Sequence, residues 1–373
     1  MARHDGALVP KSVHVVHCVY SFHVGGLEKI IANSIKGLPD YYQHTIITLT
    51  SASNEFLATL NKDIKVIELN KPSGHSWRVF YDVYQHLKQL NANVFHTYNL
   101  ASIEYQVCAF LVGVPVRVHA EHGRDLADPD GSNAKYRIIR RCCKPFIHKF
   151  VAVSHDLYKW LDKTVGLGPS KVMTILNGVD TDEFRAVIRD EDDSILVYGH
   201  VARLEGIKNQ ALMINAYAQA CANNQTFLKS TKLVLVGDGG QRKALETLVA
   251  SFELTLPITF DGVRYDMPSV YQEFDVFVLS SDAEGIPMTM LEAMATELPV
   301  VSTSVGGIPE VLDEHTGYLT PAKDKDALTQ SLLRVFERRA ELKKMGQCAR
   351  QTIIERFSQL KMLNEYMKLY ERR

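Results

Sequence analysis

Short apolar runs alternate with longer amphipathic segments along nearly the whole chain, and this alternation limits the folds that the chain can adopt. Ser12–Tyr20 (SVHVVHCVY) is typical of a buried strand, and Leu27–Lys36 of the helix that follows it. Strands that alternate with helices form parallel sheets covered by helices on both faces. The sequence therefore predicts an α/β protein.

The same pattern continues to the C-terminal region. Further strands are expected at His44–Leu49, Ile64–Leu69, Asn93–Thr97, Val116–Ala120, Lys149–Ser154, Val172–Leu176, Ser194–His200, Lys232–Gly237, Ile258–Asp261, Val276–Ser280 and Pro299–Thr303. Helices are expected at Arg78–Leu90, Ser102–Val112, Lys208–Ala222, Gly240–Phe252, Met288–Thr296 and Lys325–Phe336.

A polar segment, Arg185–Asp193 (RAVIRDEDD), divides this series into two runs and has the composition of a linker. A chain of 373 residues is also long enough for two domains. We expect doubly wound domains over residues 1–184 and 194–356, although one large α/β domain is the alternative. Parallel sheets bind ligands beyond the carboxyl ends of their strands, so two facing domains would enclose the site in a cleft.

Composition excludes several classes of protein. The 42 Lys and Arg residues nearly balance the 43 Asp and Glu residues, so there is no overall basic field to bind nucleic acid. The six cysteines form no C-x-x-C pair, which argues against a disulfide framework or structural zinc. The first residues, MARHDGALVPKS, lack the apolar core of a secretory signal, and no apolar run reaches the ~18 residues of a membrane span. We expect a cytoplasmic location.

Two features of the first half are candidates for the site. Gly25 and Gly26 stand between a strand and a helix, where backbone N–H groups can approach a phosphate. They match neither the dinucleotide fingerprint nor the P-loop, so a purely structural role is an alternative. His122 follows the strand Val116–Ala120 and should point into the cleft.

The second half offers two cations after its first strand. Arg203 and Lys208 lie five residues apart in a loop that opens a helix. Such cations can clamp a diphosphate, at about 4 kcal/mol for a charge pair near 4 Å at an effective dielectric constant of ~20. The helix dipole adds only about 0.3–1 kcal/mol, so the side chains should dominate. The alternative is a solvated surface pair.

Two carboxylates follow a later strand. Glu284 lies in the loop and Glu292 about one turn inside the next helix, so both can face the cleft. Carboxylates accept hydrogen bonds from hydroxyls, which suits the vicinal diols of a ribose or a hexose. Glu310, after the following strand, is expected to cap a helix or lie on the surface.

With these residues the chain resembles the family 4 glycosyltransferases of the GT-B fold. The elements that carry the resemblance occur in the family's order: GGLEK at 25–29, HAEHG at 119–123, VAVS at 151–154, ILNGVDTDEF at 175–184, VARLEGIK at 201–208, VGDGG at 236–240, GVRYDMP at 262–268 and the Glu-x7-Glu element from Glu284 to Glu292. HAEHGRD is similar to a bacterial subgroup linked to exopolysaccharide assembly.

The resemblance implies a retaining transfer from a nucleotide-activated sugar, usually without a metal or other cofactor. It implies that Arg203 and Lys208 neutralise the diphosphate, that Glu292 holds the ribose, and that Glu284 contacts the sugar near the reacting face. Gly25 and Gly26 would approach the phosphate, His122 would lie beside the sugar, and the backbone at Val263 and Arg264 would line the base. Many members have Glu-Gly-Phe-Gly where this chain has Glu284, Gly285, Ile286 and Pro287. Proline lacks an N–H donor, so the departure bears on which sugar is bound.

The first domain is expected to bind the acceptor, a glycan or a lipid-linked sugar. Lys135–Lys149 (KYRIIRRCCKPFIHK) combines basic residues with Ile138, Ile139, Phe146 and Ile147 and could dock on anionic lipid at the inner face of the cytoplasmic membrane. A helix with a solvated basic face is the alternative. The amphipathic tail, 357–373, is expected to pack back on the first domain, as in the fold that the chain resembles.

Two other functions remain open at this point. A nucleotide-sugar epimerase of the same architecture would need the same donor contacts. A non-catalytic sugar-nucleotide-binding subunit is disfavoured, because a scaffold has no need of the two cations and the two carboxylates together.

Overall fold

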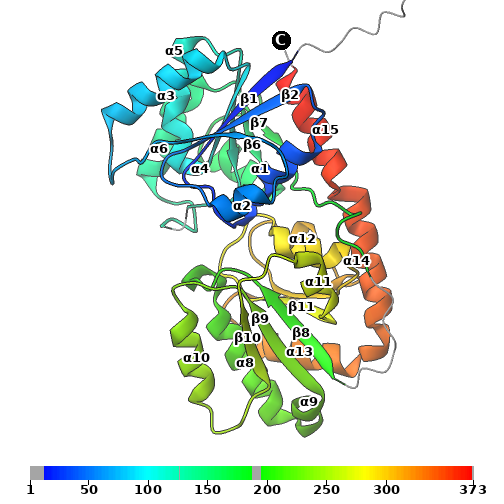
Figure 1. Cartoon of the computed structure of the whole chain (residues 1–373). Coiled ribbons are helices and arrows are strands. Elements are labelled where there is room, and N and C mark those ends of the chain that lie inside the picture. The colour runs from blue at the N-terminus through cyan, green and yellow to red at the C-terminus, as the bar shows by residue number, and fades with distance from the viewer. Residues whose placement is uncertain (1–11, 126, 187–194, 372–373) are drawn as a thin grey trace, which may run out of the picture.

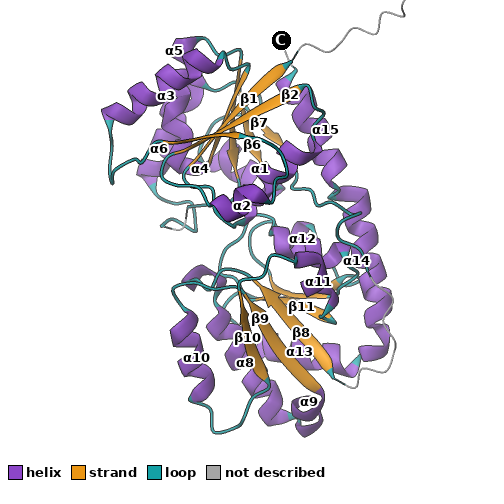
Figure 2. Ribbon diagram, viewed as in Figure 1, coloured by secondary structure: helices purple, strands orange, loops and turns teal. Residues whose placement is uncertain are grey.

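The computed structural model describes residues 12–125, 127–186 and 195–371. These residues form two parallel sheets, of seven and six strands, which lie in the upper and lower halves of Figure 1. Helices cover both faces of each sheet (Figure 2). The predicted α/β fold with two doubly wound sheets is therefore confirmed. We call residues 12–186 the N-terminal half and residues 195–356 the C-terminal half.

The first sheet has the strand order β3-β2-β1-β4-β5-β6-β7, and all its neighbouring strands are parallel. The order reverses between β1 and β4, and ligands bind at such reversals in open α/β sheets. Its strands are β1 (Val13–Val19), β2 (Tyr42–Thr48), β3 (Lys65–Glu68), β4 (Val94–Tyr98), β5 (Val116–Glu121), β6 (Lys149–Ala152) and β7 (Val172–Thr174).

The helices of this half have the periodicity that the sequence suggests. In α3, Val79, Val83 and Leu87 are buried at four-residue intervals. The α-helices are α1 (Gly26–Gly37), α2 (Asn54–Ala58), α3 (Trp77–Leu90), α4 (Asn99–Ser102), α5 (Gln106–Val112), α6 (Ala134–Cys143) and α7 (His155–Lys159). The segment expected as one helix, Ser102–Val112, is instead divided into α4, a 3₁₀ turn at Ile103–Tyr105 and α5.

The second sheet repeats the arrangement with the order β10-β9-β8-β11-β12-β13 and the reversal between β8 and β11. Its strands are β8 (Leu196–Val201), β9 (Thr231–Val236), β10 (Ile258–Gly262), β11 (Val276–Leu279), β12 (Val300–Thr303) and β13 (Gly317–Thr320). The sequence analysis does not predict β13, which is only four residues long.

The α-helices that follow along the chain are α8 (Gln210–Asn223), α9 (Gln225–Ser230), α10 (Arg242–Ala250), α11 (Met267–Gln272), α12 (Met288–Ala295), α13 (Lys325–Glu337), α14 (Leu342–Arg356) and α15 (Gln359–Tyr370). The largest cluster of buried apolar residues includes both sheets, α12 and α15, so the two halves share one continuous core.

The last helix returns to the first half. α15 packs against α1, and the Gln359 side chain donates to the Asn33 carbonyl at 2.9 Å. At the crossing between the halves, the Val179 N–H donates to the Phe357 carbonyl and the Gln359 N–H donates to the Val179 carbonyl. Figure 1 shows α14 and α15 running along one side of the molecule from the lower half to the upper half.

Most of the expected linker, 185–193, lies outside the described residues, as does the segment MARHDGALVPKS up to residue 11. In the part of the chain that the structure describes, none of the helices combines the length and the apolar character needed to cross a membrane.

Candidate active site

The predicted site residues follow the strands at which each sheet reverses its order. Gly25 and Gly26 follow β1, Arg203 and Lys208 follow β8, and Glu284 follows β11. Because β8 and β11 are neighbours, their loops begin at the same edge of the second sheet.

Gly25 is the N-cap of α1 and has an extended backbone. The Glu28 carboxylate folds back to the place where a Cβ atom at residue 25 would stand, so a larger residue there would displace it. Gly26 opens the helix, and an added Cβ would only touch Met288 of α12 at 4.0 Å. Gly26 therefore faces the C-terminal half across the junction.

Lys208 and Glu284 form an ion pair of 2.6 Å between the loops after β8 and β11. The Ser281 hydroxyl donates to the same Glu284 oxygen at 2.6 Å. The Glu284 side chain is 9% exposed, and that of Lys208 is 23% exposed. This pair leaves the second Glu284 oxygen for another donor.

Glu292 lies deeper, in α12, and is buried. Its Oε1 atom is 2.7 Å from Lys29 Nζ, which comes from α1 of the other half. Its Oε2 atom accepts a hydrogen bond of 2.8 Å from the Tyr271 hydroxyl. The GGLEK motif alone does not reveal a role for Lys29, because its partner Glu292 stands more than 260 positions away along the chain.

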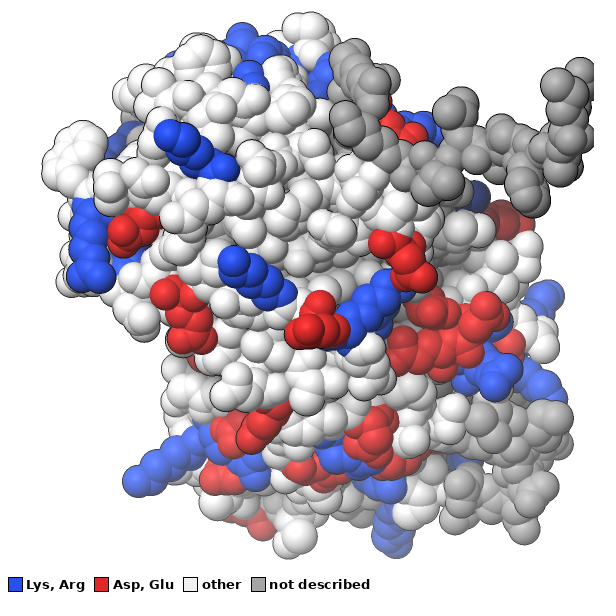
Figure 3. All heavy atoms as spheres, turned by 45° about the horizontal axis from the view of Figure 1, so that its top comes forward, with Lys and Arg blue, Asp and Glu red and all other residues white. Residues whose placement is uncertain are grey.

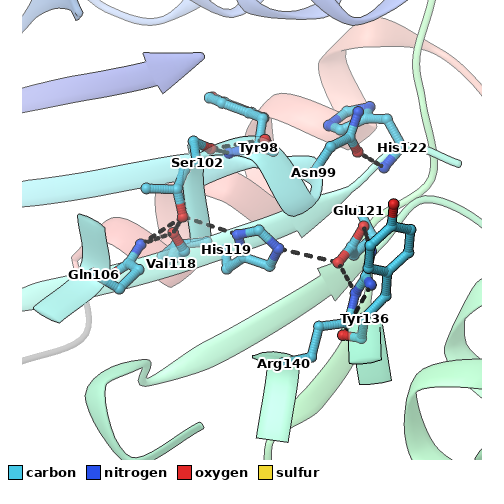
Figure 4. Close-up of polar contacts among 11 residues, drawn as sticks. Tyr98, Asn99, Ser102, Gln106, Val118, His119, Glu121, His122, Tyr136 and Arg140 are labelled. Atoms are coloured by element: carbon cyan, nitrogen blue, oxygen red, sulfur yellow. Dashed lines mark hydrogen bonds and ion pairs between the residues drawn. The ribbon is translucent and has the colours of Figure 1, made fainter. Parts of the chain in front are cut away.

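His122 is half-buried, but both of its ring nitrogens are buried, and within the described residues neither has a hydrogen-bond partner. Burial lowers the pKa of this imidazole to about 3, although the Glu121 charge raises it and the neighbouring His119 lowers it further. The His122 backbone N–H donates to Asn99 Oδ1 at 2.8 Å, as Figure 4 shows. The lowered pKa favours a neutral imidazole, and its two nitrogens are available to a ligand.

The loop after β11 packs directly on the loop that carries His122. A side chain at Gly285 would overlap the His122 carbonyl, which explains the need for glycine here. The next residue, Ile286, is buried, and its carbonyl accepts a hydrogen bond of 2.9 Å from Asn177 of the N-terminal half.

Val263 and Arg264 lie in the loop after β10, at the far side of the second sheet. Val263 is exposed, whereas the Arg264 guanidinium is bound by Asp266 at 2.7 Å and by Glu273 at 3.1 Å. The Arg264 side chain is thus occupied locally, and the backbone of the loop remains open.

A cavity of about 390 Å³ opens at the reversal of the first sheet. Residues after β1, β4 and β5 line it, and Arg203 reaches it from the C-terminal half. The lining residues of the N-terminal half include Tyr20, Ser21, Glu28, Tyr98, Asn99, Gly123, Arg124 and Asp125. Arg203 therefore connects this cavity with the loops of the second sheet.

The floor of the cavity is a buried charge pair. Arg140 donates two hydrogen bonds to Glu121, at 2.6 and 3.1 Å (Figure 4). Burial alone would raise the pKa of Glu121, but the Arg140 charge and the His119 hydrogen bond lower it to about 2. Arg140 is 1% exposed, so it is not part of a solvated basic face as the sequence of Lys135–Lys149 suggests.

The rest of that segment also differs from the expected docking face. Of its four apolar residues only Ile138 is exposed, and Ile147 lies in the core. Exposed apolar side chains lie instead on the neighbouring helices α3 and α5, at Trp77, Tyr81, Phe110 and Leu111. On the face seen in Figure 3, Lys and Arg side chains alternate with Asp and Glu side chains and with uncharged surface.

Within the described residues, no three His, Cys, Asp or Glu side chains gather as they would around a metal ion.

Comparison with known proteins agrees with this architecture. Residues 24–183 match the family described as Glycosyltransferase Family 4, and residues 195–338 match Glycosyl transferases group 1. A UDP-Gal:alpha-D-GlcNAc-diphosphoundecaprenol alpha-1,3-galactosyltransferase of Escherichia coli is 27% identical over 84% of this chain and 82% of its own length. The N-acetyl-alpha-D-glucosaminyl L-malate synthase of Bacillus anthracis is 25% identical over 75% of this chain and 74% of its own.

Solved structures share the fold. HepE of Anabaena in complex with UDP-glucose has a TM-score of 0.80 at 20% identity, over 95% of this chain and 98% of its own. The lipopolysaccharide outer core galactosyltransferase WaaB has a TM-score of 0.72 at 18% identity, over 96% and 99% of the two chains.

Proposed function

Because the chain belongs to the glycosyltransferases, with a family 4 domain followed by a group 1 domain, we propose that it transfers a sugar with retention from a nucleoside-diphosphate donor to a glycan or lipid-linked acceptor. The proposed process is the assembly of a bacterial surface polysaccharide. The observation that carries the donor site is the His122 imidazole, whose two nitrogens are buried without a polar partner among the described residues, in a loop whose backbone packs against Gly285 of the other half.

In this proposal Arg203 and Lys208 neutralise the diphosphate. Arg203 is exposed toward the cavity, and Lys208 is held by Glu284 when no phosphate is present. With a diphosphate bound, Lys208 would contact two charged phosphate oxygens in place of the Glu284 carboxylate. Glu284 would then accept hydrogen bonds from the hydroxyls of the sugar. The loop of Val263 and Arg264 would offer its backbone to the base.

Catalysis would come mainly from fixed charge. Departure of the nucleoside diphosphate builds negative charge on the phosphate oxygens, and cations already in place stabilise it in a partly dry cleft. We propose a front-face reaction, in which the leaving phosphate accepts the proton of the acceptor hydroxyl as the C1–oxygen bond forms. The proposal needs no metal ion, because the two cations supply the positive charge.

UDP is the proposed nucleotide. It is named in the HepE complexes and in the donor of the Escherichia coli relative, and this chain aligns with both over most of its length. Ile286 and Pro287 replace the Phe-Gly of many family members, so the hexose of the donor is to be identified by screening UDP-sugars.

The acceptor is proposed to enter the 390 Å³ cavity of the N-terminal half. The cavity meets Arg203, so an acceptor hydroxyl placed there would lie beside the diphosphate. A lipid-linked sugar is one candidate, since the name of the Escherichia coli relative includes a diphosphoundecaprenol acceptor.

A lipid-linked acceptor implies contact with a membrane, at its cytoplasmic face. We propose that the contact surface consists of Trp77 and Tyr81 on α3 together with Lys135–Lys149. Trp77 is 88% exposed, which is unusual for tryptophan, and aromatic rings next to basic groups are suited to the lipid headgroup region. Sedimentation with anionic and with neutral vesicles tests the surface, with Trp77→Ser as the variant. Equal, negligible binding to both kinds of vesicle would contradict it.

Transfer itself is tested by incubating the enzyme with UDP-sugars, with and without a glycan or lipid-linked acceptor. We expect a product only when both are present, with the anomeric configuration of the donor. Conversion of the donor alone into an epimer would favour the epimerase. Lys208→Ala should lower the rate of transfer by about 100- to 1000-fold, whereas Lys229→Ala, at an exposed position of α9, serves as the matched control.

A further inference from the structure

Lys29 and Glu292 join the two halves at the proposed donor site. Their charged atoms lie 2.7 Å apart, although Lys29 belongs to α1 and Glu292 to α12. The Glu292 side chain is only 2% exposed, whereas that of Lys29 is 26% exposed. A carboxylate buried to this degree needs a compensating charge, and Lys29 brings one from the opposite half.

The position of Lys29 is itself fixed. Its ammonium group lies over the Phe184 ring, 4.8 Å from the ring centroid, and Phe184 is buried. A cation over an aromatic face is attracted to it, most strongly where water is excluded. The ammonium group therefore has two partners, the ring and the carboxylate, that hold it at the junction.

The Glu292 carboxylate keeps capacity for a ligand. A carboxylate has about four acceptor positions on its two oxygens. Lys29 is ion-paired with Oε1 without hydrogen-bond geometry, and the Tyr271 hydroxyl donates a hydrogen bond to Oε2. At least one position on each oxygen remains, and the two adjacent hydroxyls of a ribose could donate to them.

We propose that Lys29 is a positioning residue for the donor ribose: reaching across the junction, it fixes the Glu292 carboxylate in the orientation that binds the nucleotide. The inference rests on the proposed function, which assigns the ribose to Glu292. It goes further in making nucleotide binding in the C-terminal half depend on the N-terminal half.

Tyr271 provides the matched comparison, since it contacts the same carboxylate from α11 of the same half. Tyr271→Phe removes a contact within one half, and Lys29→Met removes a contact between halves. Lys36→Met is the control, because Lys36 is exposed near the end of the same helix as Lys29.

The experiment measures binding and steady-state kinetics of the intact enzyme. UDP, ADP and GDP are first titrated against the wild type by calorimetry, and the tightest is used for the variants. Lys29→Met should raise the Kd of that nucleotide and the donor KM by about tenfold to a hundredfold, the size of effect expected for losing a polar contact with a charged group. The acceptor KM should change little, Lys29→Arg should restore most of the affinity, and Lys36→Met should have no effect. The thermal midpoint should fall, because Lys29→Met leaves Glu292 buried without its cation, so binding is measured well below that midpoint.

Including the variant Glu292→Gln separates a failure of the proposed donor site from a failure of the inference about Lys29. If Glu292→Gln leaves nucleotide binding unchanged, or if no nucleotide binds the wild type, the proposed site falls and the inference falls with it. If Glu292→Gln weakens binding and Lys29→Met does not, only the inference is overturned. A Lys29→Met enzyme with equal losses for donor and acceptor would show a merely structural role and would also overturn it.

Discussion

Glu310 of the C-terminal half caps α7 of the N-terminal half, with its Oε2 atom 2.8 Å from the His155 backbone nitrogen. Its Oε1 atom accepts a second hydrogen bond of 2.8 Å from the Asp156 N–H. Glu310 was expected to cap a helix or lie on the surface, and it caps a helix that belongs to the other half. The cap thus holds the two sheets together beside the proposed site.

Removal of this cap should loosen the junction. Glu310→Ala is expected to cost about 0.5–2 kcal/mol of stability, the usual effect of losing an N-terminal cap, and to lower the thermal midpoint by a few degrees. Scanning calorimetry measures the shift. Glu314→Ala is the control, because that side chain is 89% exposed, and equal midpoints for the two variants would contradict the role of the cap.

Loss of Lys208 should act on the chemical step. Lys208→Ala is expected to lower kcat by about 100- to 1000-fold with the fold intact, since it removes a fixed charge from the developing diphosphate. Glu292→Ala should abolish turnover, because the enzyme loses its contact with the ribose of the donor. Initial rates and circular dichroism measure both effects, and normal turnover by either variant would overturn the site assignment.

His122 should act as a neutral ring at every working pH. Its pKa of about 3 lies well below the assay range, so it contributes no titration to kcat/KM between pH 5 and pH 8. His122→Phe keeps the ring but removes both nitrogens, and should lower kcat/KM for the donor by about 2- to 13-fold, the value of a neutral hydrogen bond. The pH profiles of kcat/KM for the wild type and the variant should run parallel. If the wild-type profile falls at low pH and the variant profile does not, His122 titrates and the prediction is wrong.

A cluster of buried histidines should make the enzyme sensitive to acid. His17 bonds to Tyr98 at 2.7 Å and to His44 at 3.1 Å, and His96 bonds to Tyr370 at 2.8 Å. Burial, with neighbouring ionisable groups, lowers the pKa of His44 to about 4 and that of His17 and His96 well below the usual value.

The sign of the effect follows from where the protons bind. Between the unfolded pKa near 6.5 and the lower folded pKa, each histidine is protonated only in the unfolded chain, so stability falls as the pH falls. The expected slope is about 1.4 kcal/mol per pH unit for each histidine. Urea titrations at pH 7, 6 and 5 measure it, and stability that stays level over this range would contradict the prediction.

Arg140 should matter for folding more than for any surface contact. Arg140→Met would leave Glu121 buried without its cation, at an expected cost of about 3–5 kcal/mol. Lys135→Met, at an exposed position of the same helix, should change stability little. Chemical denaturation compares the two, and similar free energies of unfolding would refute the role of the Arg140–Glu121 pair.

The sequence predicted where most strands lie along the chain. Strands of a covered parallel sheet, such as β1, are largely apolar on both faces and therefore form recognisable apolar runs. It did not predict β13, because four residues carry too little periodicity. It also did not show that the expected helix at Ser102–Val112 begins earlier, at Asn99, and is divided by a 3₁₀ turn at Ile103–Tyr105. The apolar pattern is nearly the same for an α-helix and for one interrupted by a 3₁₀ turn.

Contacts between distant residues were the part that could not be predicted. The basic segment Lys135–Lys149 gives no sign that Arg140 alone turns inward, because the reason is Glu121 at the end of another strand. Lys29 stands in a motif that was recognised, but its role depends on α12. These pairings arise from the facing arrangement of two sheets, which pattern and propensity do not encode.

The hydrogen bond between His96 and Tyr370 has a consequence for synthesis of the chain. It joins residues 274 positions apart, and Tyr370 lies in the helix that covers the first sheet. A ribosome must therefore synthesise the chain as far as Tyr370 before the N-terminal half can close its interior. The half that is translated earlier is completed only after the later one.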